Sequence, residues 1–329
     1  MDLALIMAVI LGLAIGAYVL LDGFSLGVGI LFPFGWDTAQ RDQMMTSVAP
    51  VWDGNQTWLV LGGTLLFAGF PKIYSLLLPI FYVPLMVMLV ALVFRGVAFE
   101  FRFKANNKKR WDIAFTAGSI TAAFCQGLIL GTFVQGFEFV GSSIAGTLLW
   151  WTPFSIMTGF AVVCGYALLG ACWLILKTEG PLQHWLRSAA RRLLLGVMFF
   201  IALVSLWTPV VEPEIALRWF SWPNVILLAP IPMFMAGLAF ALYVSLRRSE
   251  TAPFVLCGCL FMTAYLGLVV SIWPYLVPRH ITIWAAAAPH DSLIFALVGI
   301  VLILPVIIGY TAHAYYVFRG KVRTEDAYH

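Results

Sequence analysis

One carboxylate lies inside the first long apolar run of the chain. Asp22 is embedded in the stretch from Leu20 to Gly29, which is otherwise mostly apolar. An ionisable group at such a depth in a membrane helix normally faces the interior of a helix bundle or a water-filled path. Asp22 is therefore a candidate for proton transfer. The competing interpretation is a carboxylate that a neighbouring hydroxyl or arginine simply satisfies.

A second polar group stands at the start of the next apolar run. Asp53, Asn55, Gln56 and Thr57 follow one another between two tryptophans. Asp53 alone would serve as a helix N-cap, because its carboxylate accepts hydrogen bonds from first-turn amides. The polar density exceeds what a cap requires, so we expect a hydrated polar entrance as well as a cap. With Asp22 deeper in the same half of the membrane, this order suits an inward proton relay.

Charged residues also close the third apolar run. Arg95 lies more than one helical turn deeper than Glu100 and Arg102. Because Arg95 and Glu100 are five residues apart, they are poor helical neighbours, and pairing of Arg95 with Asp22 or Asp53 across helices is open. Arg95 is thus a candidate charge partner for a buried carboxylate. Glu100 is a third acidic candidate for a proton path, although Glu100 and Arg102 would equally serve as plain anchors at the membrane surface.

Histidine positions test whether this chain carries a haem, because axial ligation needs a His, Met, Cys or Tyr at the right depth. None of the five histidines is predicted near the middle of the membrane: they are His184, His280, His290, His313 and His329. The five cysteines form neither a C-x-x-C pair nor a Cys/His group with zinc spacing. P-loop, zinc-protease and dinucleotide-binding patterns are absent. We expect no cofactor-binding, metal or complete catalytic site within the chain.

The composition is that of a membrane protein. Hydrophobic residues make up 62% and charged residues 10% of the 329 positions, against about 45–50% and about 25% in soluble domains. Lipid permits only helices or closed barrels, and the long unbroken apolar runs lack the alternation of a barrel. We expect an all-α polytopic protein in which residues 1–329 form a single membrane domain. The first run lacks the charged start and cleavage site of a secretory signal, so we expect it to be retained.

Windows of about 20 apolar residues predict about nine membrane-spanning helices. They cover residues 3–34, 55–76, 77–103, 112–136, 152–177, 189–211, 222–246, 253–275 and 289–318. With this count, fifteen of the nineteen Lys and Arg residues, Arg323 in the tail among them, fall at one set of helix ends. The positive-inside rule makes those ends cytoplasmic, which places the N-terminus outside and the C-terminus in the cytoplasm.

Two glycines mark a candidate contact face on the first helix. Gly23 and Gly27 are four residues apart, a spacing that lets another helix approach closely. The ordinary enrichment of glycine in membrane helices explains the pair as well.

Four stretches closely resemble subunit II of cytochrome bd-type quinol oxidases: Leu21–Gly29, Trp52–Gln56, Phe94–Arg102 and Tyr310–Lys321. The resemblance covers essentially the whole chain and implies two four-helix bundles plus one peripheral helix. It also implies a heterodimer with a subunit I that holds two b-type haems, one d-type haem and the quinol site, where O2 is reduced to water. Subunit II would be haem-free and contribute a cytoplasmic proton route, to which the motif match assigns Asp22, Asp53 and Glu100.

The same resemblance carries finer implications. The chain length and residues 122–137 resemble the cyanide-insensitive branch of the family. A small single-span subunit and membrane lipid are further expected partners, whereas nothing in the sequence supports nucleic-acid binding. Some family members hold a structural quinone in this subunit, and no residue here identifies such a site. The family pattern leads us to expect an acidic residue after Trp284, but Ala285 stands there, which puts any role of that carboxylate in doubt.

Two other functions compete with an oxidase subunit. A secondary transporter would also bury carboxylates, but transporter folds usually carry matching broken helices in two halves. Here the polar residues concentrate in the first three spans, which favours the oxidase. An assembly scaffold, in which buried acids serve only helix packing, is the third interpretation.

Overall fold

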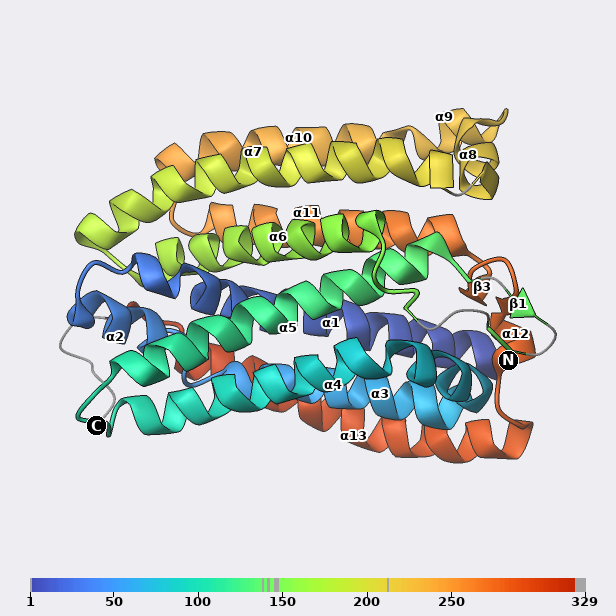
Figure 1. Cartoon of the computed structure of the whole chain (residues 1–329), viewed down its shortest axis with the longest axis horizontal. Coiled ribbons are helices and arrows are strands. Elements are labelled where there is room, and N and C mark those ends of the chain that lie inside the picture. Colours follow the sequence, from blue (N-terminus) through green and yellow to red (C-terminus); the bar gives the residue numbers. More distant parts are fainter. Residues whose placement is uncertain (1, 138, 141–142, 145–147, 212, 323–329) are drawn as a thin grey trace.

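A computed structural model describes residues 2–137, 139–140, 143–144, 148–211 and 213–322. The described chain consists almost entirely of long helices that lie side by side along the longest axis, with short segments joining their ends (Figure 1). Arg323 and His329, which entered the sequence-based expectations, lie outside the described residues.

Two four-helix bundles form the body of the molecule. The first contains α1 (Leu3–Leu31), α3 (Trp52–Gly69), α4 (Pro71–Arg102) and α5 (Lys109–Gln135), and the second contains α6 (Pro153–Lys177), α7 (Gly180–Val211), α10 (Pro230–Arg248) and α11 (Ala252–Ile272). α1 and α5 pack against α6, which joins the bundles, whereas α13 (His290–Val317) lies at the side against α3 and α1 (Figure 1). This architecture confirms the prediction of two bundles plus a peripheral helix.

The number of spans agrees approximately with the sequence. Among the described residues, 8 helices are long and apolar enough to cross a membrane. α3 is a further long helix of 18 residues, which at 1.5 Å per residue extends about 27 Å. Its first turns contain Asp53, Asn55, Gln56 and Thr57, so it is less apolar than the others. The nine predicted spans correspond to these helices and α3.

Two predicted boundaries are wrong. The second and third helices separate at Phe70 rather than between residues 76 and 77, because Pro71 begins α4 at a position where its missing N–H costs nothing. α7 begins at Gly180 rather than near residue 189. Its first turns are amphipathic, with Leu186 buried and His184 exposed, and a search for uniformly apolar runs passes over such a segment.

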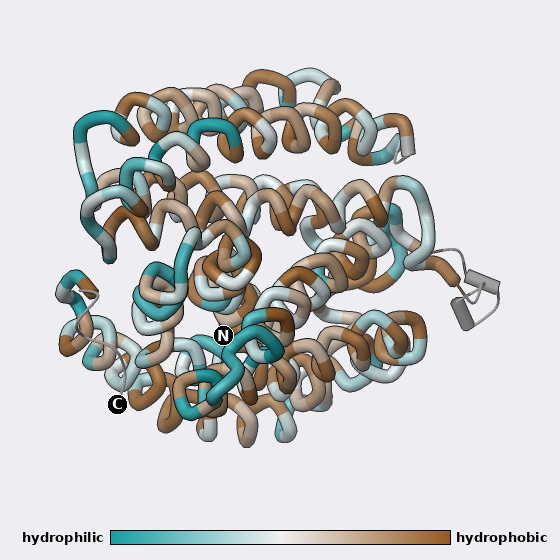
Figure 2. The backbone as a smooth tube through the Cα atoms, turned by 60° about the vertical axis from the view of Figure 1, so that its left-hand side comes forward, coloured by the Kyte–Doolittle hydropathy of each residue, from teal (hydrophilic) through white to brown (hydrophobic). Residues whose placement is uncertain are grey.

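Short elements connect the long helices at the two ends of the molecule (Figure 1). η1 (Phe32–Phe34) and α2 (Thr38–Thr46) follow α1, whereas α8 (Pro213–Phe220), α9 (Asn224–Leu228) and α12 (Ile283–Ala286) lie at the opposite end. Two antiparallel hairpins at that opposite end pair β1 (Phe139–Val140) with β2 (Ser143–Ile144) and β3 (Tyr275–Val277) with β4 (Ile281–Thr282). Figure 2 shows hydrophilic residues gathered in the connections and hydrophobic residues along the helices.

α1 and α13 begin at the same end of the molecule, so the described chain starts and finishes at opposite ends. At the starting end, Trp284 Nε1 donates to Asp2 at 2.6 Å. At the other end, the Val322 amide donates to the Lys177 carbonyl at 2.9 Å. We call this second end the charge-rich end; its basic residues include Arg41, Arg102–Arg110, Lys177–Arg192, Arg247–Arg248 and Arg319–Lys321.

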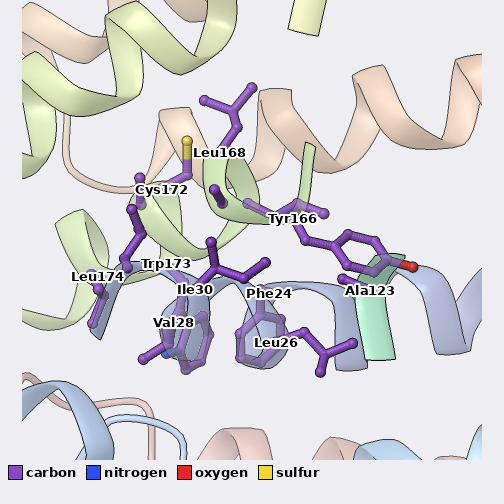
Figure 3. Packing of buried hydrophobic residues seen from close by; sticks show 14 of the residues in the cluster. Phe24, Leu26, Val28, Ile30, Ala123, Tyr166, Leu168, Cys172, Trp173 and Leu174 are labelled. Carbon is purple, nitrogen blue, oxygen red and sulfur yellow. The ribbon is translucent and has the colours of Figure 1, made fainter. Parts of the chain in front are cut away.

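The centre of the core is the crossing of α1 and α6. Every residue from Asp22 to Leu31 is buried, so this half of α1 is enclosed on all sides. Figure 3 shows α1 side chains packed on those of α6, and Phe24 stacks on Trp173 with 4.2 Å between ring centroids. A Cβ on Gly27 would lie 1.8 Å from the Tyr166 carbonyl oxygen. The Gly23–Gly27 face is therefore a close helix contact.

Gly27→Ala is expected to lower the yield and thermal stability of the folded subunit, because the added methyl group overlaps α6 backbone. Overpacking of this kind costs about 1–3 kcal/mol or more. Gly63→Ala is the matched control, since a Cβ there meets nothing within 4 Å. Membrane yield and the midpoint of thermal unfolding of both variants check the expectation. A Gly27→Ala protein as stable as the Gly63→Ala protein would contradict the close crossing.

Candidate functional site

A buried ion pair joins α1 to α4. Asp22 Oδ1 accepts hydrogen bonds from Arg95 Nη1 at 2.9 Å and from Ser25 Oγ at 2.7 Å. Arg95 Nη2 donates to Ser25 Oγ at 2.6 Å. All three residues are 0% exposed. Of the two partners that the sequence left open for Arg95, the structure shows Asp22.

The local sequence explains why these groups meet. Asp22 and Ser25 are three residues apart on α1, so their side chains share one face. Gly118 of α5 lets α4 come close, because a Cβ there would lie 2.6 Å from the Ala91 carbonyl oxygen and 3.2 Å from Arg95 Cβ. In this apolar interior the attraction between the two charges is weakly screened, so each charge depends on the other for its stability.

One atom on each side of the ion pair lacks a protein partner. Within the described residues, Asp22 Oδ2 and Arg95 Nε are buried and make no hydrogen bond. Buried polar atoms are normally satisfied by protein or by water. Asp22 Oδ2 can therefore accept a hydrogen bond from a water molecule, while Oδ1 is held by Arg95.

Asn55 links the start of α3 to the backbone beside Asp22. Its Nδ2 donates to the Leu21 carbonyl at 2.9 Å, and its Oδ1 accepts from Tyr315 Oη of α13 at 2.8 Å. Asn55 is 1% exposed. The residue predicted to line a hydrated entrance is thus a buried bridge between α1, α3 and α13.

The other residues of the predicted polar entrance divide into exposed and buried groups. Asp53 and Thr57 are exposed, whereas Gln56 Nε2 is buried without a partner among the described residues. The N-cap of α3 is Val51, and Asp53 lies in the first helical turn. The expectation that Asp53 is the N-cap is therefore wrong, because the helix already begins at Trp52, the residue before Asp53.

Glu100 lies at the same end of the molecule but is not brought to Asp22. It is exposed on α4, while Arg95 points into the bundle one and a half turns deeper. The Trp52 ring at the start of α3 stacks on Phe99 with 4.9 Å between centroids. Glu100 thus follows a residue that contacts α3, and its own side chain is exposed.

A small cavity lies where α3 meets α13. It has a volume of about 10 Å³ and is lined by Gly54, Asn55, Thr311 and Tyr315 together with neighbouring apolar residues. Thr311 Oγ1 is buried without a hydrogen-bond partner among the described residues. This volume approaches that of a single water molecule, and Asn55 and Thr311 supply polar groups for it.

A hydrogen-bonded chain that the sequence did not reveal lies on the other side of Asp22. Tyr166 Oη of α6 donates to Gln126 Oε1 at 2.7 Å, and Gln126 Nε2 donates to Tyr18 Oη at 2.8 Å. Tyr18 precedes Asp22 by one helical turn and therefore shares its face of α1. In the sequence, the one indication of these hydrogen bonds is Gln126, a polar side chain within an apolar run.

Comparisons with known proteins agree with this geometry. A family model described as cytochrome bd terminal oxidase subunit II matches residues 3–318. The chain belongs to this family. Cytochrome bd-I ubiquinol oxidase subunit 2 of Escherichia coli (strain K12) is 27% identical over 96% of this chain and 94% of that protein. Cytochrome bd ubiquinol oxidase subunit 2 of Bacillus subtilis (strain 168) is 26% identical over 93% of each.

A solved structure extends the agreement to the fold. A chain of the bd oxidase from Geobacillus thermodenitrificans matches with a TM-score of 0.79, covering 97% of this chain and 99% of that chain at 18% identity. The two chains therefore share their helical fold despite their low identity.

This member of the subunit II family also has a charge network that the sequence did not reveal. Arg102 is 0% exposed, and it donates to Asp42 and to Asp112, each at 2.5 Å. Lys108 pairs with Asp42 at 2.8 Å and Arg41 with Asp112 at 3.1 Å. The interpretation of Arg102 as a plain surface anchor is wrong, because acids from α2 and α5 cover it. In the sequence, Asp42 and Asp112 among the basic residues at the helix ends could have indicated this network.

Proposed function

We propose that this chain is the haem-free subunit II of a quinol:O2 oxidoreductase, which supports a haem-bearing subunit I and supplies part of the proton path. Family membership and relatives that are named ubiquinol oxidase subunits support the assignment. The observation that carries the proton-path role is a buried carboxylate with one unpartnered oxygen, Asp22 Oδ2. Membership of the oxidase subunit family removes the support for a secondary transporter. Turnover of the variants with neutralised carboxylates distinguishes a proton path from a pure assembly scaffold.

We infer that the haems are held by subunit I and not by this chain. His184, His280, His290 and His313 are all exposed, whereas an axial histidine must reach a haem enclosed by protein. Among the described residues, no group of three His, Cys, Asp or Glu side chains is placed to hold a metal ion. We assign two haem b, one haem d and the site of quinol oxidation to subunit I.

Histidine substitutions test this assignment. His184→Ala, His280→Ala, His290→Ala, His313→Ala and His329→Ala, made singly, are expected to leave every haem absorption band of the purified complex unchanged, because the proposal assigns all axial ligands to subunit I. Visible spectra of the reduced complexes are the measurement. Loss of one haem band from an assembled complex would contradict the assignment, and a colourless, functional monomer would overturn the oxidase proposal itself.

The proposed proton route starts at the charge-rich end. Asp53 is exposed in the first turn of α3, and Glu100 is a second exposed carboxylate at the same end of the molecule. Gln56 and Thr57 follow Asp53 on α3, and the small cavity at Thr311 is lined by Gly54 and Asn55 of the same helix. Asn55 leads inward, because it binds the carbonyl of Leu21, the residue before Asp22. Reduction of O2 to water consumes protons inside the membrane, so carboxylates arranged from surface to interior suit that demand. Oxygen consumption by Asp53→Asn complexes tests the route.

The cellular setting follows from charge and family. The chain is a multi-pass protein of the bacterial inner membrane. We place its charge-rich end in the cytoplasm and the start of α1 outside, following the positive-inside rule. We also treat residues 1–329 as a single membrane domain. A structural quinone, a small single-span partner and membership of the cyanide-insensitive branch stay predictions that rest on the resemblance.

A further inference from the structure

A second polar site lies far from Asp22, between the start of α7 and the end of α10. A cavity of about 390 Å³ opens there at the charge-rich end. Its lining comprises Gln183, His184, Arg187, Ser188, Arg191, Leu246 and Arg247. Three guanidinium groups and one imidazole thus surround the cavity, and none of the described residues that line it carries a carboxylate. Such a lining favours an anionic ligand.

The arginines are partly fixed in place before any ligand binds. Arg187 Nη1 donates to the carbonyls of Leu246 and Ser249 at 2.8 Å and 2.9 Å, which clamps α7 to the end of α10. Arg191 Nε is buried and has no hydrogen-bond partner among the described residues. The Arg247 guanidinium lies 5.8 Å from the centre of the Tyr243 ring. A buried donor without a partner next to a basic cavity indicates that an acceptor belongs there.

Glu250, which bonds the lining residue Gln183, is already engaged. Glu250 accepts from Lys321 at 2.7 Å and from Gln183 at 3.0 Å. Hydrogen bonds from Lys321 and then Gln183 lower the pKa of Glu250 below its usual value, so Glu250 stays ionised and paired with Lys321 at neutral pH. Among the described residues that line the cavity, Arg191 and Arg247 therefore have no carboxylate as a counter-charge.

Next to the cavity, α7 and α10 carry exposed apolar side chains. On α7, Leu195 and Phe199 follow Arg191 at intervals of four residues and are 65% and 62% exposed. On α10, Phe240 precedes Arg247 by seven residues and is 71% exposed. α7 and α10 together form the outer layer of the second bundle (Figure 1). A basic cavity at a membrane surface that continues into an exposed apolar strip matches an anionic head with acyl chains.

We propose that this cavity binds the headgroup phosphate of an anionic phospholipid, whose acyl chains lie along the exposed faces of α7 and α10. Arg191 and Arg247 hold the phosphate oxygens, and Ser188 and His184 add donors at the rim. A zwitterionic lipid would bring its ammonium group toward the arginines, so the site discriminates by charge. The lipid would fasten α7 to α10, which form the outer layer of the second bundle.

Lipid binding to the purified complex tests the proposal. Phosphatidylglycerol, phosphatidylcholine with the same acyl chains, and inorganic phosphate are titrated separately, with bound lipid counted by native mass spectrometry and the thermal midpoint recorded. The wild-type complex is expected to bind phosphatidylglycerol at least about tenfold more tightly than phosphatidylcholine, because two arginines attract an anionic headgroup that carries no ammonium group. The thermal midpoint rises with phosphatidylglycerol and is unchanged by inorganic phosphate.

Matched variants locate the site. Arg191→Gln/Arg247→Gln is expected to abolish the preference for phosphatidylglycerol, whereas Arg192→Gln/Arg248→Gln, which removes the neighbouring exposed arginines outside the lining, keeps it. Because the two lipids are compared within each variant, a general loss of stability cancels. Equal binding of both lipids by the wild type, an equal loss in both variants, or the same stabilisation by inorganic phosphate would overturn the proposal.

Discussion

Arg95→Leu is expected to remove most of the assembled, haem-containing complex from the membrane. The substitution leaves the Asp22 carboxylate buried at 0% exposure without its 2.9 Å partner. Breaking one side of a buried ion pair in this way costs about 3–5 kcal/mol, a large part of the stability of a typical domain. Complex yield from haem absorbance and the thermal midpoint of the remaining complex are the measurements.

Two further variants show whether charge pairing is the cause. Lys104→Leu removes an exposed basic residue from the end of the same segment and is expected to change stability by no more than about 0.5 kcal/mol. Asp22→Leu/Arg95→Leu removes both charges and is expected to recover much of the yield, since apolar replacement of a whole buried pair is often neutral. Equal yields of Arg95→Leu and Lys104→Leu would show that Arg95 is dispensable for the fold.

Neutralising the proposed relay is expected to slow turnover without removing the haems. Asp22→Asn alone would leave Arg95 as an uncompensated buried cation, so Asp22→Asn/Arg95→Gln is the sharper variant: it keeps hydrogen-bonding side chains of similar size and removes both charges. An amide cannot release a proton. The loss of a positioned proton-transfer group reduces a rate by about 100-fold or more, and we expect a decrease of this order in oxygen consumption with quinol.

Asp53→Asn is expected to have a smaller effect of the same kind, because water reaches this exposed position and replaces part of its function. The deficit of both variants should grow as the pH rises, since protons become scarcer at the entrance. Asp37→Asn is the matched control. Asp37 is an exposed acid at the same end that caps α2 by accepting from the Gln40 amide at 2.7 Å, and Asn caps equally well. Wild-type turnover in the relay variants would leave Asp22 as a packing residue.

Much of this architecture was predictable because membrane helices follow from composition and helix length. The buried Asp22, its candidate partner Arg95 and the polar start of α3 are visible as polar residues in apolar surroundings. Which carboxylate pairs with Arg95 was not predictable, since that choice depends on how closely α4 approaches α1. Gly118 of α5 sets how closely α4 packs on α5 and therefore where Arg95 lies, and no local spacing in α1 or α4 encodes it.

The errors have a common cause in contacts between distant segments. Arg102 stands at the end of an apolar helix, where a surface anchor is the usual role, yet Asp42 and Asp112 fold over it. Asn55 reads as part of a wet entrance, yet Leu21 and Tyr315 enclose it. Asp53 is a residue type that often caps helices, yet α3 begins one residue before it, at Trp52. Sequence indicates polar residues of interest, but burial decides which of them exchange with water.

Time-resolved proton uptake tests the proposed relay most directly. Quinol-reduced complex is mixed with O2 in weakly buffered solution that contains a pH indicator, while haem oxidation is followed in the same sample. We expect proton uptake in the Asp22→Asn/Arg95→Gln complex to be delayed by the same factor as its turnover, with a smaller delay in Asp53→Asn and none in Asp37→Asn. Uptake at the wild-type rate in both relay variants would contradict a proton path through this subunit.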